Sequence, residues 1–416
     1  MKYSVLNISI LTTLASLILL CSCQRPNSDT GTDKVVTPTP VLVQEISLEE
    51  ARNSAETVDR KVCFIGIDAL TWDVLQPLLD QGELPNIQRL IDNGSRGVFD
   101  TADDHLFSPR IWTSMATGKM PDKHGIEFFF INPDQAKSSG KTAGSDLREC
   151  LAVWNILSHF NKRILVSNYM VTWPAETING KVISDYFYME QGTYPEGMTM
   201  ALQHLYFHKT KRKLHDDRIY DRFFPWFTSE GNSGLSKGEL IKIDNLAEIL
   251  VRDEISMDKA LQLAKSEPPD LAMLYLRGTD IASHFYWKYS QLPKDDPRLE
   301  GLEENIRRFE NVIPEVYRWA DEYVGRIINT WPKDTNFILV SDHEFKTLFN
   351  DLRGYNILKL IGDGKWASYE KNGQWIPIVT ETADPIDPVR RFYLIEDRLE
   401  DYFATNGGTR ESFLSE

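Results

Sequence analysis

The sequence contains few cysteines. Four of its 416 residues are Cys, and none of them forms a CxxC pair or a zinc-finger spacing. Cys21 and Cys23 lie in an N-terminal leader, which leaves Cys63 and Cys150 for the folded body. This number excludes a disulfide-rich scaffold. One disulfide is allowed in an exported protein, but we expect two buried free thiols.

Positive charge is also scarce, because 46 Lys and Arg residues stand against 61 Asp and Glu residues and give a net charge of −15. A surface of this sign repels the phosphates of a nucleic-acid polymer, so we expect no nucleic-acid partner. A small phosphate ester is still compatible with an acidic protein when bound cations supply positive charge. The hydrophobic share of 42% is enough for a sizeable globular core.

A long apolar run occurs only near the N-terminus, over Val5–Leu20. It is shorter than a comfortable membrane span and predicts a signal peptide over residues 1–22. Leu20, Ser22 and Cys23 resemble a bacterial lipobox. On that resemblance Cys23 is the lipidated first residue of an exported lipoprotein that is anchored to a membrane and faces the periplasm or the cell surface. The alternative is an ordinary cleaved signal without lipid.

The rest of the chain divides into a linker and one folded body. Residues 23–45 are rich in Ser, Thr, Asp and Pro, lack periodicity and predict an extended linker. Residues 46–416 are expected to form one domain. Within it, residues 186–242 are aromatic-rich and carry a basic stretch, and we interpret them as an inserted, lid-like segment.

The body alternates between strand-like and helix-like segments. Short apolar runs predict strands, and amphipathic stretches between them predict helices. The expected strands lie within 61–70, 96–99, 162–174, 269–280 and 335–343, and the expected helices include 72–94, interrupted at 82–85, 246–265 and 312–331. This order predicts an α/β fold with a mostly parallel central sheet and helices on both faces.

Three of the expected strands end in aspartate, at Asp68, Asp280 and Asp342. Ligands of such sheets bind beyond the carboxyl ends of the strands. His284 follows Asp280 by one helical turn on the same face, and His343 adjoins Asp342. Carboxylate and imidazole together suit zinc or manganese, so we expect divalent metal ions at this edge. The alternatives are helix caps and, for Asp280 with His284, a salt-bridged helix start.

Ser108 begins the helix-like stretch "SPRIWTSMATG" over residues 108–118. Ser followed by Pro is a common helix start, which favours a capping role. A Ser hydroxyl is also a nucleophile when a metal or a base lowers its pKa, and a helix N-terminus favours a phosphate oxygen. From the residues alone, both roles stay open for Ser108.

Four motifs together resemble a known family. They are "IGIDALTWDVLQPLLDQGELPNIQRLIDNG", "SPRIWTSMATGKMPDKHGI", "YLRGTDIASHFYWKY" and "ILVSDHEFK". In this order they resemble the type I phosphodiesterase/nucleotide pyrophosphatase branch of the alkaline phosphatase superfamily, over about residues 60 to 360. The resemblance implies an alkaline-phosphatase-like sandwich and two divalent ions, usually zinc. It also implies a Thr or Ser nucleophile that is itself a metal ligand.

Carried over to this chain, the resemblance assigns the nucleophile and one metal site. Asp68 matches the metal ligand on the first strand, and Ser108 matches the nucleophile. Asp342 and His343 would complete the site of that ion.

The resemblance assigns Asp280 and His284 to the second ion. His124, in "KHGI", is interpreted as structural. His105 and Arg110 flank the nucleophile and are expected at the surface, with a phosphate contact as the alternative.

The sequence departs from the family pattern after His343. The family completes the second ion with a further His, but none of the eight His follows position 343, so we expect that site to be weak. The usual Asp-His-Gly is Asp-His-Glu here, and Glu344 is a substitute ligand, a capping group or a neutral change. The Asn with which the nucleotide pyrophosphatase branch holds a phosphate oxygen falls near Phe128–Phe130, so this chain departs from the family pattern at that contact as well. Either the chain is C-terminally truncated or it naturally lacks the last His.

These observations predict a metal-dependent phosphoester hydrolase that acts on a phosphodiester or a nucleotide through Ser108. One alternative is a catalytically reduced cell-surface binding protein of the same fold that keeps one metal. The other is a phosphoryl transferase of the phosphoethanolamine type. Sulfatase chemistry is less favoured, because "SPRIW" overlaps the "CxPxR" pattern only in part. The sequence leaves the substrate and the oligomeric state open.

Overall fold

A computed structural model describes most of the body but not the leader or linker. The described residues are 60–99, 101, 107–129, 142–211, 217–227, 234–296, 299–346, 368–371, 374–377, 379–382 and 391–394. The predicted signal peptide, Cys23 and the linker lie outside these ranges, as does His105, and stay predictions. Within the described ranges, no helix is sufficiently long and apolar to span a bilayer.

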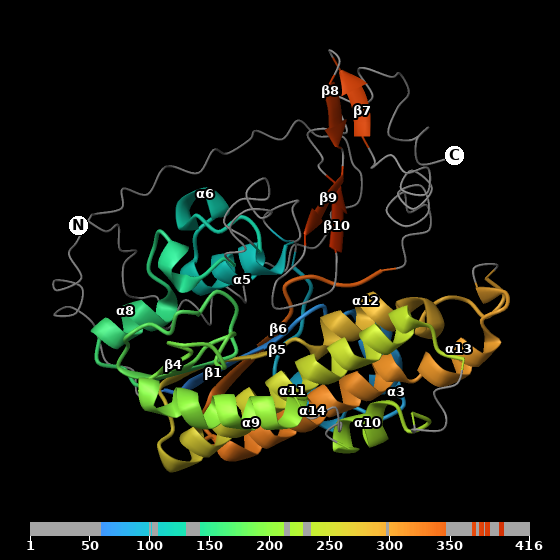
Figure 1. Ribbon diagram of the computed structural model, residues 1–416. Helices are drawn as coiled ribbons and strands as arrows, with labels where there is room; N and C mark the ends of the chain where they lie inside the picture. Colours follow the sequence, from blue (N-terminus) through green and yellow to red (C-terminus); the bar gives the residue numbers. More distant parts are fainter. Residues whose placement is uncertain are drawn as a thin grey trace, which may run out of the picture.

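The centre of the fold is a six-stranded sheet with the order β4-β3-β2-β5-β1-β6 (Figure 1). All neighbours are parallel except β3 and β4. The strands are β1 (Val62–Ile67), β2 (Ile164–Ser167), β3 (Gly180–Ile183), β4 (Thr193–Tyr194), β5 (Leu271–Leu276) and β6 (Asn336–Val340). Two separate antiparallel pairs follow, formed by β7 (Ser368–Lys371) with β8 (Gln374–Pro377) and by β9 (Val379–Thr382) with β10 (Arg391–Leu394).

Alternate residues of the central strands face two different hydrophobic clusters. In β5, Ala272, Leu274 and Leu276 belong to one cluster, and Leu271, Met273 and Tyr275 belong to the other. All six residues are buried. An apolar strand with this pattern is typical of a parallel sheet that is covered on both faces. The predicted α/β fold is therefore confirmed.

The helices form a layer on each face of the sheet. Figure 1 shows α5, α6 and α8 on one side and α9, α11 and α14 on the other. The helices are α3 (Trp72–Asp80), α4 (Pro85–Asp92), α5 (Ser108–Thr117), α6 (Pro121–His124), α8 (Val153–His159), α9 (Thr199–Lys211), α10 (Asp217–Phe223), α11 (Lys237–Ser266), α12 (Gly278–Ser290), α13 (Glu303–Phe309) and α14 (Val312–Thr330). The interruption expected near residues 82–85 separates α3 from α4.

The predicted strand at 96–99 is wrong. These residues follow α4 without regular secondary structure, and the side chains of Val98 and Phe99 are 75% and 60% exposed. A short apolar run forms a strand only when a neighbouring strand accepts its backbone hydrogen bonds, and none of the described strands lies beside it.

The aromatic-rich segment 186–242 supplies α9 and α10. Helix α9 contacts α11, and α10 contacts α11 and α14. Tyr206, Tyr220 and Phe224 of this segment join the hydrophobic cluster on that face. The segment thus contributes to the core, and its lid-like role stays a prediction.

Helix α4 begins with Pro85 and has no side-chain cap of its own. Asp321 of α14 takes that place, because its carboxylate accepts from the backbone N–H groups of Asn86 (3.1 Å) and Ile87 (2.7 Å). The two helices approach closely here, since a Cβ atom on Gly325 would lie 2.5 Å from the Asn86 side chain. Asp321 is 2% exposed, so its loss would leave buried donors unsatisfied.

We expect Asp321→Ala to lower the free energy of unfolding by roughly 2–4 kcal/mol, because it removes a buried charged acceptor of several N–H groups. Urea denaturation followed by circular dichroism measures this change. Asp92→Ala is the matched control, because Asp92 accepts one exposed hydrogen bond from Gln88, and its loss should change stability by less than about 0.5 kcal/mol. Equal effects of the two substitutions would contradict the capping role.

Candidate functional site

The site lies at the carboxyl ends of the three adjacent strands β5, β1 and β6. Asp68 directly follows β1, and Asp342 lies two residues after β6. Asp280 lies in the first turn of α12, which begins two residues after β5. The predicted convergence of the three strand-end aspartates is confirmed in position, since parallel strands end at one common edge.

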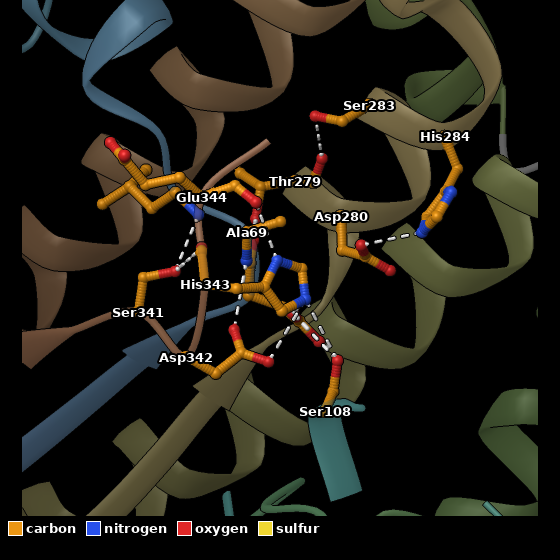
Figure 2. A network of polar contacts seen from close by, with 12 residues as sticks. Ala69, Ser108, Thr279, Asp280, Ser283, His284, Ser341, Asp342, His343 and Glu344 are labelled. Atoms are coloured by element: carbon orange, nitrogen blue, oxygen red, sulfur yellow. Dashed lines mark hydrogen bonds and ion pairs between the residues drawn. The ribbon is translucent and has the colours of Figure 1, made fainter. Parts of the chain in front are cut away.

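Asp68, Asp342 and His343 form a compact cluster, and Figure 2 labels Asp342 and His343 of it. One ligand atom from each lies within 4.8 Å of the others. The Nε2 atom of His343 lies 3.6 Å from Oδ1 of Asp68 and 3.4 Å from Oδ2 of Asp342. Both carboxylates are almost completely buried.

His343 presents a lone pair or a proton to these carboxylates. Its Nδ1 atom lies 2.9 Å from the carbonyl oxygen of Glu344, and a carbonyl only accepts, so Nδ1 carries a hydrogen. Nε2, the other ring nitrogen, therefore faces Asp68 and Asp342. Metal-binding His residues typically donate their second N–H in this way.

The charge distribution fits a bound cation. Burial raises the pKa of Asp68, and the fields of Asp342 and Asp280 raise it further. Oδ2 of Asp342 is buried and accepts no hydrogen bond from the described part of the chain. Burial opposes protonation of His343, but the fields of Asp342 and Asp280 outweigh it and raise the pKa of the imidazole. A divalent ion at this cluster would neutralise the carboxylates, and oxygen and nitrogen ligands suit zinc or manganese.

Ser108 lies beside the cluster. Its Oγ atom is 3.5 Å from Oδ1 of Asp68 and 3.3 Å from Nε2 of His343. Ser108 is the first residue of α5, whose capping position is occupied by Phe107 without a side-chain capping bond. The hydroxyl therefore points to the cluster and does not cap the helix, and Ser108 is 6% exposed.

Tyr275 fixes the orientation of the Asp68 carboxylate. Its hydroxyl donates to Oδ2 of Asp68, which leaves Oδ1 for Ser108 and His343. The ring of Tyr275 packs edge-on against Trp112 of α5 at 5.1 Å. Sequence reasoning missed Tyr275, because a buried Tyr in an apolar strand gives no sign of which carboxylate it meets.

The turns after β1 and β6 are tied together. Ala69 has a left-handed backbone with φ of 52°, and its N–H donates to Oδ1 of Asp342 at 3.3 Å. The N–H of Leu70 donates to the Ser341 hydroxyl at 2.9 Å, and that hydroxyl donates to the carbonyl of His343 at 2.8 Å. These bonds hold the ligand-bearing turns of both strands in one arrangement.

Asp280 and His284 form a second group on α12. His284 Nε2 lies 3.2 Å from Oδ1 of Asp280, one helical turn away (Figure 2). The side chain of His284 is 49% exposed and contacts the edge of Phe345. Among the described residues, the candidate metal cluster does not include this pair, although the charge of Asp280 acts on Asp68.

Glu344 has a structural contact. Its Oε1 atom accepts from the N–H of Trp72 at 3.0 Å, at the start of α3. Of the three roles open from sequence, the structure shows the capping contact.

His124 is buried, as its structural interpretation requires. Its Nδ1 atom accepts from the N–H of Ile126 at 3.1 Å, and Nε2 contacts the Ser114 hydroxyl at 3.0 Å. Burial lowers its pKa to about 4, so the ring is neutral. Cys63 is buried and Cys150 is half-buried, and both are free thiols.

A comparison with known protein families identifies the class of the chain, which is an α/β protein of the alkaline phosphatase superfamily. The chain belongs to the type I phosphodiesterase / nucleotide pyrophosphatase family, whose profile matches residues 62–403. The recognised family is therefore confirmed, and its members are phosphoester hydrolases.

Two solved structures of phosphonoacetate hydrolase from Sinorhizobium meliloti 1021 are similar to the chain. The complex with phosphonoformate has a TM-score of 0.40 and 13% identity, and the match covers 85% of this chain and 71% of that one. The complex with phosphonoacetate has a TM-score of 0.36 and 14% identity, and the match covers 75% of this chain and 64% of that one. No curated protein matches the sequence.

We expect Tyr275→Phe to weaken zinc binding about 10- to 100-fold, because it frees the Asp68 carboxylate from its orienting donor. Equilibrium dialysis of zinc against the full chain measures this. Tyr169→Phe is the matched control, because Tyr169 is buried in the same aromatic cluster but donates to the carbonyl of Trp112. Unchanged zinc affinity in Tyr275→Phe would exclude the orienting role.

Proposed function

We propose that the protein is a metal-dependent phosphoester hydrolase that acts through Ser108. The observation that carries this proposal is the position of the Ser108 hydroxyl at the N-terminus of α5, against Oδ1 of Asp68 and Nε2 of His343. Membership in a family of phosphoester hydrolases supports the same reaction.

The residues that would hold a metal are Asp68, Asp342 and His343, with Ser108 as a further ligand. A divalent ion there supplies positive charge that lowers the pKa of the serine hydroxyl and offsets the charge of the phosphoryl group. We assign the second ion to Asp280 and His284, and two protein ligands predict weak binding there.

Residues of the chain direct the displacement of the leaving group at phosphorus. Ser108 Oγ forms the new bond to phosphorus while the bond from phosphorus to the leaving oxygen breaks, which gives a phosphoserine and an alcohol or nucleotide. Tyr275 holds Asp68 still, and the positive end of α5 favours the phosphoryl oxygens. Water then releases phosphate, or the remaining monoester, from Ser108.

We expect Ser108→Ala to reduce hydrolysis of bis-p-nitrophenyl phosphate by about a thousandfold or more, in the presence of added zinc or manganese. The control is Ser114→Ala on the same helix, because Ser114 donates to the Arg110 carbonyl and contacts His124 instead of the cluster. Equal turnover by wild type and Ser108→Ala would refute the mechanism.

Two other functions remain alternatives, and a specific observation supports one of them. A binding protein with one metal is favoured by the separation of Asp280 and His284 from the three-residue cluster. A zinc titration distinguishes the hydrolase from the binding protein. Two bound ions with turnover would support the hydrolase, and one bound ion without turnover would support the binding protein. A phosphoryl transferase would use the same phosphoserine with an alcohol acceptor in place of water, so product analysis with added ethanolamine distinguishes it.

We also propose, from the sequence around Cys23, that the chain is a lipid-anchored exported protein. Cys23→Ser is expected to move the protein from the membrane fraction to the soluble fraction of bacterial cells and to abolish palmitate labelling. Cys63→Ser is the control, because Cys63 lies inside β1. Palmitate labelling that persists in Cys23→Ser would contradict the anchor.

A further inference from the structure

Arg277 lies beside the metal cluster at the end of β5. The register of the parallel pair places Ile67 of β1 opposite Leu276 of β5. The N–H of Asp68 continues the ladder, because it donates to the carbonyl of Leu276 at 3.0 Å. Asp68 and Arg277 therefore occupy neighbouring positions at the edge where the site is built.

Arg277 directly follows β5 and is the N-cap residue of α12. It lies at the sheet edge where Asp68 follows β1. The Oγ atom of Ser108 lies 3.5 Å from Oδ1 of Asp68. Arg277 and Ser108 therefore both lie close to Asp68.

Arg277 differs from Arg148 and Arg252, because none of the described carboxylates forms an ion pair with it. Arg148 pairs with Glu176 at 2.7 Å, and Arg252 pairs with Glu248 at 2.5 Å. Within the described ranges, the Arg277 side chain makes no ion pair, and its Nε atom is buried without a hydrogen-bond partner. A buried donor of this kind is costly unless a ligand or water satisfies it.

Two carboxylates nevertheless act on Arg277. Burial opposes its positive charge, but Tyr275, Tyr186, Asp68 and Asp280 outweigh burial and raise its pKa. The tyrosine hydroxyls are neutral while they are protonated, so Asp68 and Asp280 supply the negative charge. When these carboxylates hold cations, their charge is neutralised and the guanidinium is left to attract an anion. Guanidinium groups donate in a planar fork that matches phosphate oxygens.

We propose that Arg277 is a substrate-binding residue that donates hydrogen bonds to the non-reacting oxygens of the phosphoryl group. The ligand class is a phosphate oxyanion, either free or as an ester. This inference rests on the proposed function, because it takes the phosphoryl group to lie between Ser108 and the cluster. The competing role for Arg277 is to balance the charge of the carboxylates, in which case it would support metal binding.

The test compares Arg277→Gln and Arg277→Lys with wild type in the full, zinc-loaded chain. Isothermal titration with inorganic phosphate measures anion affinity, and zinc stoichiometry is measured in parallel. We expect Arg277→Gln to weaken phosphate binding about 10- to 100-fold at unchanged zinc content, and Arg277→Lys to recover part of it. Arg326→Gln is the control, because Arg326 of α14 pairs with Asp258 of α11 and its loss should not alter phosphate binding.

Two results would overturn the proposal, namely wild-type phosphate affinity in Arg277→Gln, or a loss of zinc that accounts for the loss of phosphate. If Arg277→Gln does not fold, Arg277→Lys decides, since wild-type affinity in that variant would show that the forked donor is not used. Absence of ester hydrolysis by wild type would refute the hydrolase. The phosphate titration would still report on Arg277.

Discussion

Asp68, Asp280 and Asp342 are buried at the ends of adjacent strands, where each negative charge raises the free-energy cost of the others. The surrounding structure offsets this repulsion. Tyr275 donates to Asp68, the N–H of Ala69 donates to Asp342, and the imidazole of His343 lies between the two carboxylates. These contacts are weaker than a divalent cation would be. The arrangement is therefore suited to a metal site. The neighbouring donors and the imidazole are placed where they reduce the repulsion between the carboxylates.

The parallel sheet holds these charges in place because its backbone bonds are buried and paired on both sides of β1. Directly after β1, the chain departs from regular strand geometry. Ala69 has a left-handed conformation, which costs about 1 kcal/mol or more for a residue with a Cβ atom. The Tyr317 hydroxyl accepts from Thr71 at 3.0 Å and, with Ser341, stabilises the turn. These hydrogen bonds hold the turn after β1 in place, next to the groups that would contact the phosphoryl group.

The sequence predicted the parts of the site that depend on local pattern. Asp68 and Asp342 were recognisable because each ends an apolar strand, and parallel strands end at one edge. Tyr275 was not, because its role depends on which strand lies beside β5 and on the face it shares with α5. The proposed role of Arg277 depends on the same strand pairing. The strand expected at 96–99 failed for a related reason, since strand formation needs a partner that composition does not reveal. The contact of Glu344 with the start of α3 depends on the position of the turn after β6 beside that helix, which the sequence does not give.

The two halves of the candidate site differ in strength. Asp68, Asp342 and His343 offer three ligand atoms in one cluster, whereas His284 of the Asp280 pair is half exposed. A phosphoryl group held by a single strong cation would leave part of its charge unbalanced. In the proposed reaction Arg277 supplies further positive charge beside Asp68, to which Ser108 is also close. A guanidinium cannot activate the serine as a metal does, but it can bind the oxygens that carry charge in the transition state. The weak second site proposed for Asp280 and His284 would therefore be complemented by an arginine that pairs with none of the described carboxylates.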